Sequence, residues 1–252
     1  MKDISVIIPA QNEEDYLPRT LDALSSQRSL SKMEIIVSVS PDTTDNTRYI
    51  ATSYGCKVCE GGRTATAKNN GARIASHSTL FFMDADTYPE HDRFFSALLD
   101  EFYSRNLDVA GCLLSPDYNK GGFKEFLYRT AFGFVNKQFL RSEKTLNPRK
   151  ATGNVFRKRA FFDLGGFREG IFAEDFEVMR RAVSPPHNFE FGILRDCGPL
   201  KTSVRRYEGE GKYKEVGGIL RTTLKGLYFI AKAEALGYDS IQGSADSYFG
   251  RN

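Results

Sequence analysis

The first half of the chain alternates short apolar runs with amphipathic stretches. Runs rich in β-branched or aromatic residues occupy positions 4–8, 34–39, 56–58 and 80–83. Between them, apolar residues recur three or four positions apart, the spacing of amphipathic helices, at 12–24, 45–54 and 65–76. This alternation predicts an α/β fold whose central sheet is mostly parallel and carries helices on both faces.

The second half is less regular. We expect helices at 122–140, 175–182 and 216–236, and strands around 189–194 and up to Arg206. The first of these helices is rich in aromatic residues, and its spacing groups on one side Phe123, Phe126, Leu127, Ala131 and Phe134. Because no repeat or linker composition interrupts the chain, we expect one domain over residues 1–252.

The net charge and its distribution along the chain narrow the classes of molecule that the protein binds. The 252 residues carry 35 Lys and Arg against 32 Asp and Glu, a net charge of +3, which argues against a dedicated nucleic-acid-binding protein. The segment 120–160 nevertheless holds eleven basic and two acidic residues. That segment either faces an anionic lipid surface, with its Phe side chains at the interface, or forms a core-packing helix with a solvated basic face.

Cysteine usage and hydropathy bear on the compartment. Four cysteines are too few for a disulfide scaffold, and the lone CxxC at Cys56 and Cys59 lacks a second pair of metal ligands, so we expect free thiols in a reducing cytosol. No apolar stretch approaches the length of a membrane span, and the N-terminus lacks the pattern of a signal peptide. We therefore expect a cytoplasmic protein, with peripheral contact to the inner face of the membrane left open.

Two carboxylates follow the apolar run at 80–83. In parallel sheets ligands bind at the carboxyl ends of the strands, and Asp84 and Asp86 occupy such an end. Mg²⁺ or Mn²⁺ is commonly held by one or two carboxylates together with substrate phosphates. A divalent-cation site is favoured here over a polar turn in which Asp86 caps the next helix.

A second acidic pair opens the predicted helix at 175–182. Acidic residues at a helix N-terminus interact favourably with the helix dipole, which by itself explains Glu174 and Asp175. Beside a metal-held donor the same position suits a general base that deprotonates an acceptor hydroxyl. The base is the favoured interpretation once the first acidic pair is taken into account.

Four basic residues are candidates for phosphate contacts, although each alone is more typical of a solvated surface charge. They are Arg63, Lys68, Arg205 and Arg206. The chain contains neither a GxGxxG nor a GxxxxGK[ST] motif, and no GxSxG nucleophile motif.

Taken together, these segments resemble the family 2 glycosyltransferases of the GT-A fold, over most of residues 3–182. The resemblance is carried by the order and spacing of ISVIIPAQNEEDYLPRTLDAL, EIIVSVSPDTTDNT, GGRTATAKNNGARIA, FFMDADTYP, TGNVFRKRAFFDLGGFRE and AEDFEVMRRA. It implies an inverting transfer from a nucleotide-sugar donor, most simply a UDP- or GDP-sugar, with Mg²⁺ or Mn²⁺ as cofactor. It also implies a nucleotide-sugar-binding half at about 1–116 and an acceptor-binding half at about 117–252.

The resemblance assigns roles to individual positions. It implies a nucleotide site lined by Pro9, Ala10, Gln11 and Glu13. It places Asp84 near the ribose and Asp86 on the metal, and makes Asp175 the base.

This chain departs from the family pattern at several positions. The family's base-holding Asp after the second strand aligns with Val39 and Ser40, so Asp42 is the candidate substitute, and Gln11 replaces an aromatic residue. The QxxRW segment of processive members is absent, which favours a single transfer to an acceptor sugar or a polyprenyl phosphate lipid. A sugar nucleotidyltransferase and a binding-only relative remain alternatives, although the three retained carboxylates favour an enzyme.

Overall fold

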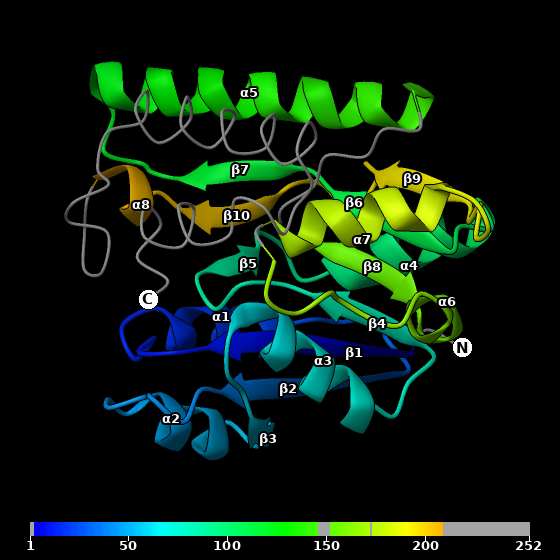
Figure 1. Cartoon of the computed structure of the whole chain (residues 1–252). Coiled ribbons are helices and arrows are strands. Elements are labelled where there is room, and N and C mark those ends of the chain that lie inside the picture. Colours follow the sequence, from blue (N-terminus) through cyan, green and yellow to red (C-terminus); the bar gives the residue numbers. More distant parts are fainter. Residues whose placement is uncertain (1–2, 146–151, 172, 209–252) are drawn as a thin grey trace.

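The computed structural model describes residues 3–145, 152–171 and 173–208 (Figure 1). The helix expected at 216–236 lies outside the described residues. The larger sheet has seven strands in the order β3-β2-β1-β4-β8-β6-β9. Its strands are β1 (Asp3–Ala10), β2 (Lys32–Val39), β3 (Lys57–Glu60), β4 (Thr79–Phe82), β6 (Val109–Cys112), β8 (Asn154–Arg157) and β9 (Phe191–Leu194).

The expected mostly parallel sheet is confirmed, with one antiparallel strand inside it. β1 pairs in parallel with β2 and β4, β2 with β3, and β6 with β9. β8 runs antiparallel between β4 and β6. The start of β8 therefore lies at the edge where β1, β2 and β4 end, because antiparallel neighbours reverse direction.

Helices pack on the sheet through its alternating side chains. The helices of the first half are α1 (Leu17–Ser25), α2 (Thr47–Ser53), α3 (Thr64–Ile74) and α4 (Phe94–Ser104). Those of the second half are α5 (Gly122–Thr145), α6 (Lys158–Asp163), α7 (Glu174–Val183) and the short α8 (Arg205–Glu208).

Two adjacent phenylalanines of β4 show that both faces of the sheet are covered. Successive side chains of a strand point to opposite faces. Phe81 packs edge-on against Phe95 of α4 with ring centroids 5.0 Å apart, while Phe82 packs against Phe161 of α6, also at 5.0 Å. Burial of both rings fixes the register of β4 and with it the position of the carboxylates that follow.

The carboxyl ends of the parallel strands form one edge. Ala10 lies opposite Val39, and Val39 lies opposite Glu60. A Cβ atom on Gly61 would lie 2.8 Å from backbone atoms of the β2 turn, so only glycine permits this close approach. The loops after β1, β2, β3 and β4 therefore converge, as parallel topology predicts.

A three-stranded sheet that the sequence did not predict lies beside this edge. It consists of β5 (Thr87–Pro89), β10 (Leu200–Ser203) and β7 (Leu114–Asp117) in the order β5-β10-β7. β10 runs antiparallel to β5, and the Ser203 amide donates to the Asp86 carbonyl at 3.1 Å. The residues after β10 are therefore delivered directly to Asp86. Arg205 and Arg206, expected at the end of a strand, lie instead in α8.

The helix α5 forms the outer border of the molecule on the side away from β2 and β3 (Figure 1). It packs against β7 and β9 and extends five residues beyond the expected end. The sequence left open whether the Phe123 side of this helix faces the core or the outside, and the structure decides it. The buried aromatic residues are Tyr128, Phe132 and Phe139, whereas Phe123, Phe126 and Phe134 are exposed.

Candidate active site

Three residues from distant parts of the chain meet at Asp86. The Arg205 guanidinium places Nε 2.8 Å from Asp86 Oδ2, and a terminal nitrogen 2.8 Å from Glu13 Oε2. All three side chains are largely buried. One arginine thus forms ion pairs with two carboxylates, one after β1 and one after β4.

The loop after β1 is held in place by bonds to the loop after β2. The Glu13 amide donates to Thr47 Oγ1 at 2.8 Å, and the Glu14 amide donates to Asp45 Oδ2 at 3.0 Å. The guanidinium carbon of Arg205 lies 4.1 Å from the centroid of the Tyr16 ring, a cation–π contact. These contacts fix Glu13 and Arg205 before any ligand binds.

Burial alters the acidity of Asp86. Removal from water raises the pKa of Asp86 to about 6; the Arg205 charge opposes the rise, and the negative charges of Asp84 and Glu13 add to it. Asp86 therefore lies out of water beside two further carboxylates, Asp84 and Glu13, whose charges are opposed by those of Arg205 and Arg206. Such an environment favours a cation of higher charge.

A second cluster surrounds Asp175 at the start of α7. Both Asp175 carboxylate oxygens accept from Lys68 Nζ, at 2.8 and 2.7 Å, and Oδ1 also accepts from Asn154 Nδ2 at 2.8 Å. Lys68 Nζ lies 3.4 Å from Glu174 Oε1 as well. Because Lys68 comes from α3 and Asn154 from β8, the carboxylate is held from two sides.

Two buried carboxylates in this cluster face a single ammonium. Burial raises the pKa of Asp175 to about 7; Lys68 opposes the rise, and the Glu174 and Asp84 charges add to it. Burial alone would lower the pKa of Lys68, but Asp175 and Glu174 outweigh it and raise that pKa above its ordinary value. Lys68 therefore stays charged between the Asp175 and Glu174 carboxylates.

Asp84 links the two clusters. Its charge contributes to the raised pKa of both Asp86 and Asp175, so it lies within electrostatic reach of each. Its own amide donates to Thr152 Oγ1 at 3.3 Å, two residues before Asn154. The structure thus gathers Glu13, Asp84, Asp86, Glu174, Asp175, Lys68 and Arg205 at one edge of the sheet.

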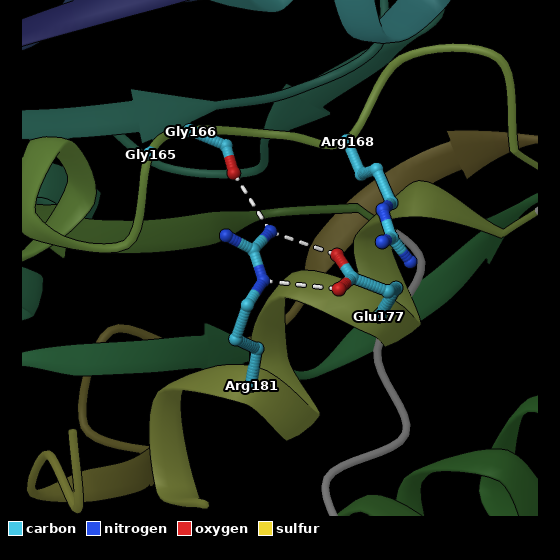
Figure 2. A pocket seen from close by; sticks show the side chains of 5 residues that line it. All are labelled: Gly165, Gly166, Arg168, Glu177 and Arg181. Atoms are coloured by element: carbon cyan, nitrogen blue, oxygen red, sulfur yellow. Dashed lines mark hydrogen bonds and ion pairs between the residues drawn. The ribbon is translucent and has the colours of Figure 1, made fainter. Parts of the chain in front are cut away.

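A network on another side of α7 fixes the direction of this helix (Figure 2). Arg181 is held by both oxygens of Glu177, and its guanidinium also donates to the Gly166 carbonyl at 2.8 Å. Asp175 and Glu177, two positions apart, do not share a face of the helix. The recess lined by Arg168, Glu177 and Arg181 therefore serves to anchor α7 against the 165–166 turn rather than to extend the Asp175 cluster.

The remaining predicted residues lie at the end of β1, on the loops after β1, β2 and β3, and in α8. Pro9 and Ala10 end β1 as expected, whereas the side chains of Gln11, Asp42 and Arg63 are exposed on the converging loops. Asp45, rather than Asp42, makes the contacts between the β1 and β2 loops. Arg206 follows Arg205 in α8 and adds its charge to the field at Asp86.

The structure changes one assignment and adds two residues. Lys68, a candidate for phosphate contact, is buried against Asp175. Asn154 and Tyr16 also contact the site, and the sequence singled out neither of them. The single available signal for Asn154 was a polar residue entering an otherwise apolar strand.

The carboxylates of the site match some, but not all, of the ligands that a divalent cation needs. Oxygen ligands such as Asp84 and Asp86 suit Mg²⁺ or Mn²⁺. Among residues 3–145, 152–171 and 173–208, no group of three or more His, Cys, Asp or Glu side chains is gathered to hold a metal alone. The donor set therefore suits an ion that completes its shell with substrate phosphate oxygens, and at Asp86 Oδ2 such an ion would compete with Arg205.

Comparison with known proteins decides the family. The model of the family described as "Glycosyl transferase family 2" matches residues 5–168. The chain belongs to this family. It is therefore a glycosyltransferase, and the expected enzyme class is confirmed.

Relatives of this glycosyltransferase match parts of it to different extents. It is 26% identical over 209 residues to Glycosyltransferase AglE of Haloferax volcanii, covering 79% of this chain and 67% of AglE. It is 36% identical over 110 residues to 4,4'-diaponeurosporenoate glycosyltransferase of Staphylococcus haemolyticus, covering 40% of this chain. The match spans 28% of the length of that second relative.

Solved structures confirm the fold class. S. aureus TarS 1-349 in complex with UDP-GlcNAc superimposes with a TM-score of 0.63 at 21% identity, over 86% of this glycosyltransferase and 62% of that chain. Glucosyl-3-phosphoglycerate synthase from Mycobacterium tuberculosis, in complex with Mn²⁺, UDP and phosphoglyceric acid, gives 0.56 at 18% identity, over 84% and 75%. These structural similarities show the GT-A fold.

Within the described part of the chain, no helix has the length and apolar character needed to cross a bilayer.

Proposed function

We propose that this glycosyltransferase moves a sugar, with inversion, from a nucleoside diphosphate sugar to an acceptor hydroxyl, and that Asp175 is the general base. The observation that carries the proposal is the buried Asp175 carboxylate, bonded by Lys68 and Asn154 at the same edge as Asp84 and Asp86. A carboxylate with a pKa near neutrality is suited to accept a proton at physiological pH.

The residues divide the reaction between them. Asp175 accepts the proton of the acceptor hydroxyl while that oxygen bonds to the anomeric carbon, and the bond from this carbon to the diphosphate oxygen breaks on the opposite face. Lys68 and Asn154 orient the carboxylate and limit its motion. Because one displacement occurs, the anomeric configuration inverts.

A divalent cation bound by Asp86, with Asp84 beside the ribose, would stabilise the negative charge that develops on the leaving diphosphate. Displacement from Asp86 would free Arg205 for the diphosphate oxygens, for which a guanidinium is well suited. Arg206 and the exposed Arg63 are further candidates for that contact. Pro9, Ala10, Gln11, Glu13 and Asp42 would line the nucleotide on the converging loops.

The donor is proposed to be a UDP-sugar. TarS has been crystallised with UDP-GlcNAc, and glucosyl-3-phosphoglycerate synthase with UDP and Mn²⁺. For the acceptor we propose a sugar hydroxyl or a polyprenyl phosphate lipid, bound by the half of the chain after about residue 116. With a lipid phosphate as acceptor, the role of Asp175 would be to exclude water and position the acceptor.

Thermal stabilisation of the full chain by UDP-, GDP- and dTDP-sugars, each with and without Mn²⁺, tests the proposal. We expect a UDP-sugar with Mn²⁺ to raise the melting temperature most, and Asp86→Asn to remove the part that depends on Mn²⁺. Asp175→Asn should retain this stabilisation but lose about 10² to 10⁴-fold in turnover, the usual contribution of a general base. Normal turnover of Asp175→Asn, or stabilisation by none of the three donors, would refute it.

A further inference from the structure

The helix α5 exposes three phenylalanines that the fold does not use. Phe123, Phe126 and Phe134 are 73%, 63% and 58% exposed. The rings of Phe123 and Phe126 stack on each other with centroids 6.4 Å apart, so they form a joint apolar patch. Large aromatic side chains grouped on a surface mark a site of interaction with a partner or a membrane.

The opposite side of α5 provides its contacts to the protein. Tyr128 and Phe132 are buried and approach the ring of Tyr207, with centroids 6.0 and 6.3 Å apart. Asn136 bonds both the amide and the carbonyl of Leu114 in β7, at 3.0 and 2.7 Å. Because α5 is already anchored through this side, its exposed phenylalanines are not needed for docking onto the sheet.

The exposed residues form a stripe along the whole helix. Steps of three or four residues lead along one face from Phe123 through 126, 130, 134, 137 and 141 to Lys144. These twenty-two residues of helix, 123–144, span about 33 Å. The first half of the stripe is aromatic, and the second half is basic.

Charge on this helix is predominantly positive where it faces solvent. Lys124, Arg129, Lys137, Arg141 and Lys144 are exposed. The two acidic residues of α5 are half-buried and engaged: Glu125 accepts from Arg129 at 2.8 Å, and Glu143 accepts from Arg105 and Arg195. An outward face with cations and aromatic rings matches the headgroup region of an anionic bilayer.

We propose that the exposed face of α5 binds the surface of an anionic lipid bilayer. The three Phe rings enter the boundary between headgroups and acyl chains, and Lys137, Arg141 and Lys144 lie against the headgroups. α5 lies along the outer border of the molecule, with the seven-stranded sheet behind it, so the helix can rest on a flat surface over its length (Figure 1). This surface is independent of the proposed transfer reaction.

Vesicle co-sedimentation of the full chain tests the proposal. Vesicles of phosphatidylcholine with 30% phosphatidylglycerol are compared with pure phosphatidylcholine at low and high NaCl. We expect binding to the anionic vesicles at low salt, and weaker binding at high salt because exposed charges are screened. Absence of binding to anionic vesicles at low salt would overturn the proposal.

Two variants separate the apolar and ionic contributions. Phe123→Ser/Phe126→Ser/Phe134→Ser should weaken vesicle binding at least about tenfold, since each ring loses its apolar burial. Lys137→Glu/Arg141→Glu should abolish the preference for anionic lipid. Tyr49→Ser is the matched control, because Tyr49 is 74% exposed on α2 at the far end of the molecule.

Light scattering on the same samples tests whether the exposed face of α5 binds a second copy of the chain instead of a bilayer. The proposal requires the triple Phe variant and the unaltered chain to have the same mass in solution without lipid. If the unaltered chain is a dimer that the triple variant converts to a monomer, the face binds a second copy and the proposal is overturned. Equal vesicle binding by the triple variant and the unaltered chain would overturn it as well.

Discussion

Arg205 is bonded to Asp86, with Nε 2.8 Å from Oδ2, at the position where the sequence predicts a metal ligand. The same guanidinium contacts Glu13, so it compensates two buried carboxylates with one charge. On the proposed function, a divalent cation that binds Asp86 Oδ2 would have to open this ion pair. Arg205 would then compete with the cation and would become available for the diphosphate.

Replacing Arg205 by Gln should strengthen metal binding in the absence of nucleotide. Asp86 and Glu13 would then lack their compensating charge, and we expect Mn²⁺ to bind about tenfold more tightly, which corresponds to about 1.4 kcal/mol. Titration calorimetry with Mn²⁺ measures this. Arg159→Gln is the charge-matched control because Arg159 is 93% exposed. An unchanged or lower Mn²⁺ affinity in Arg205→Gln would contradict the competition.

Turnover should rise with pH up to about 7. Burial, with the neighbouring acidic charges, raises the pKa of Asp175 to about 7, and only the carboxylate can accept a proton. Below that pH, kcat/KM should fall about tenfold per pH unit. The rate profile of the unaltered enzyme, measured with saturating Mn²⁺, checks this. A flat profile between pH 5 and 7 would exclude Asp175 as the base.

The stability of the fold should change with pH in the opposite direction to turnover. The pKa of Asp175 is higher in the folded chain than its ordinary value of 3.8, so the folded state binds the proton more tightly between pH 3.8 and about 7. In that window Asp175 makes the free energy of unfolding decrease as pH rises. Asp175→Asn should remove this part of the slope in urea denaturation at a series of pH values. An identical slope in both proteins would contradict the raised pKa.

Lys68 should be important for stability. Lys68→Met leaves Glu174 and Asp175 buried without a cation, at an expected cost of about 3 to 5 kcal/mol in the free energy of unfolding. Arg28→Met, which breaks a contact between the exposed side chains of Arg28 and Asp92, should cost less than about 1 kcal/mol. Urea denaturation at pH 7.5 compares the two. Adding Asp175→Asn to Lys68→Met should recover part of the loss, and a further loss would contradict the pairing.

Glu34 should stabilise the sheet only above acidic pH. Burial alone would raise the pKa of Glu34, but bonds from Lys57, Ser5 and Ser76 outweigh it and lower the pKa to about 2. Its stabilisation is present above pH 4.5 and is lost as pH falls towards 2. Glu34→Gln should cost about 1 to 2 kcal/mol at pH 7 and less at pH 3 in urea denaturation. An equal cost at both pH values would refute this dependence.

Asp84 and Asp86 show how much of the site a local sequence pattern predicts. The run at 80–83 predicts a buried strand, and the structure has β4 at Thr79–Phe82 with Asp84 and Asp86 following it. That this strand end is a ligand site stays a prediction. The ion pair of Asp86 was not predictable from the same pattern. It depends on β10 pairing with β5, and no periodicity near Asp86 encodes the strand that arrives from residues 200–203.

For α5, too, the local sequence pattern predicts the element but not its tertiary contacts. Helical spacing predicted that α5 exists, because the 3.6-residue period is a local property of the chain. Aromatic residues lie on both sides of this helix, so spacing alone left open which side is buried. The structure buries the Tyr128 side because β7 and Tyr207 lie there.

The sequence by itself determined the alternation of strands and helices, the family, and the positions of the acidic residues at strand ends. These follow from apolar periodicity and from spacing along the chain, which are local. Only the tertiary structure decided that Lys68 pairs with Asp175, that Arg205 pairs with Asp86, and which face of α5 is exposed. Each depends on strand register and helix packing between residues far apart in sequence, where burial and charge compensation, rather than local preference, select the partner.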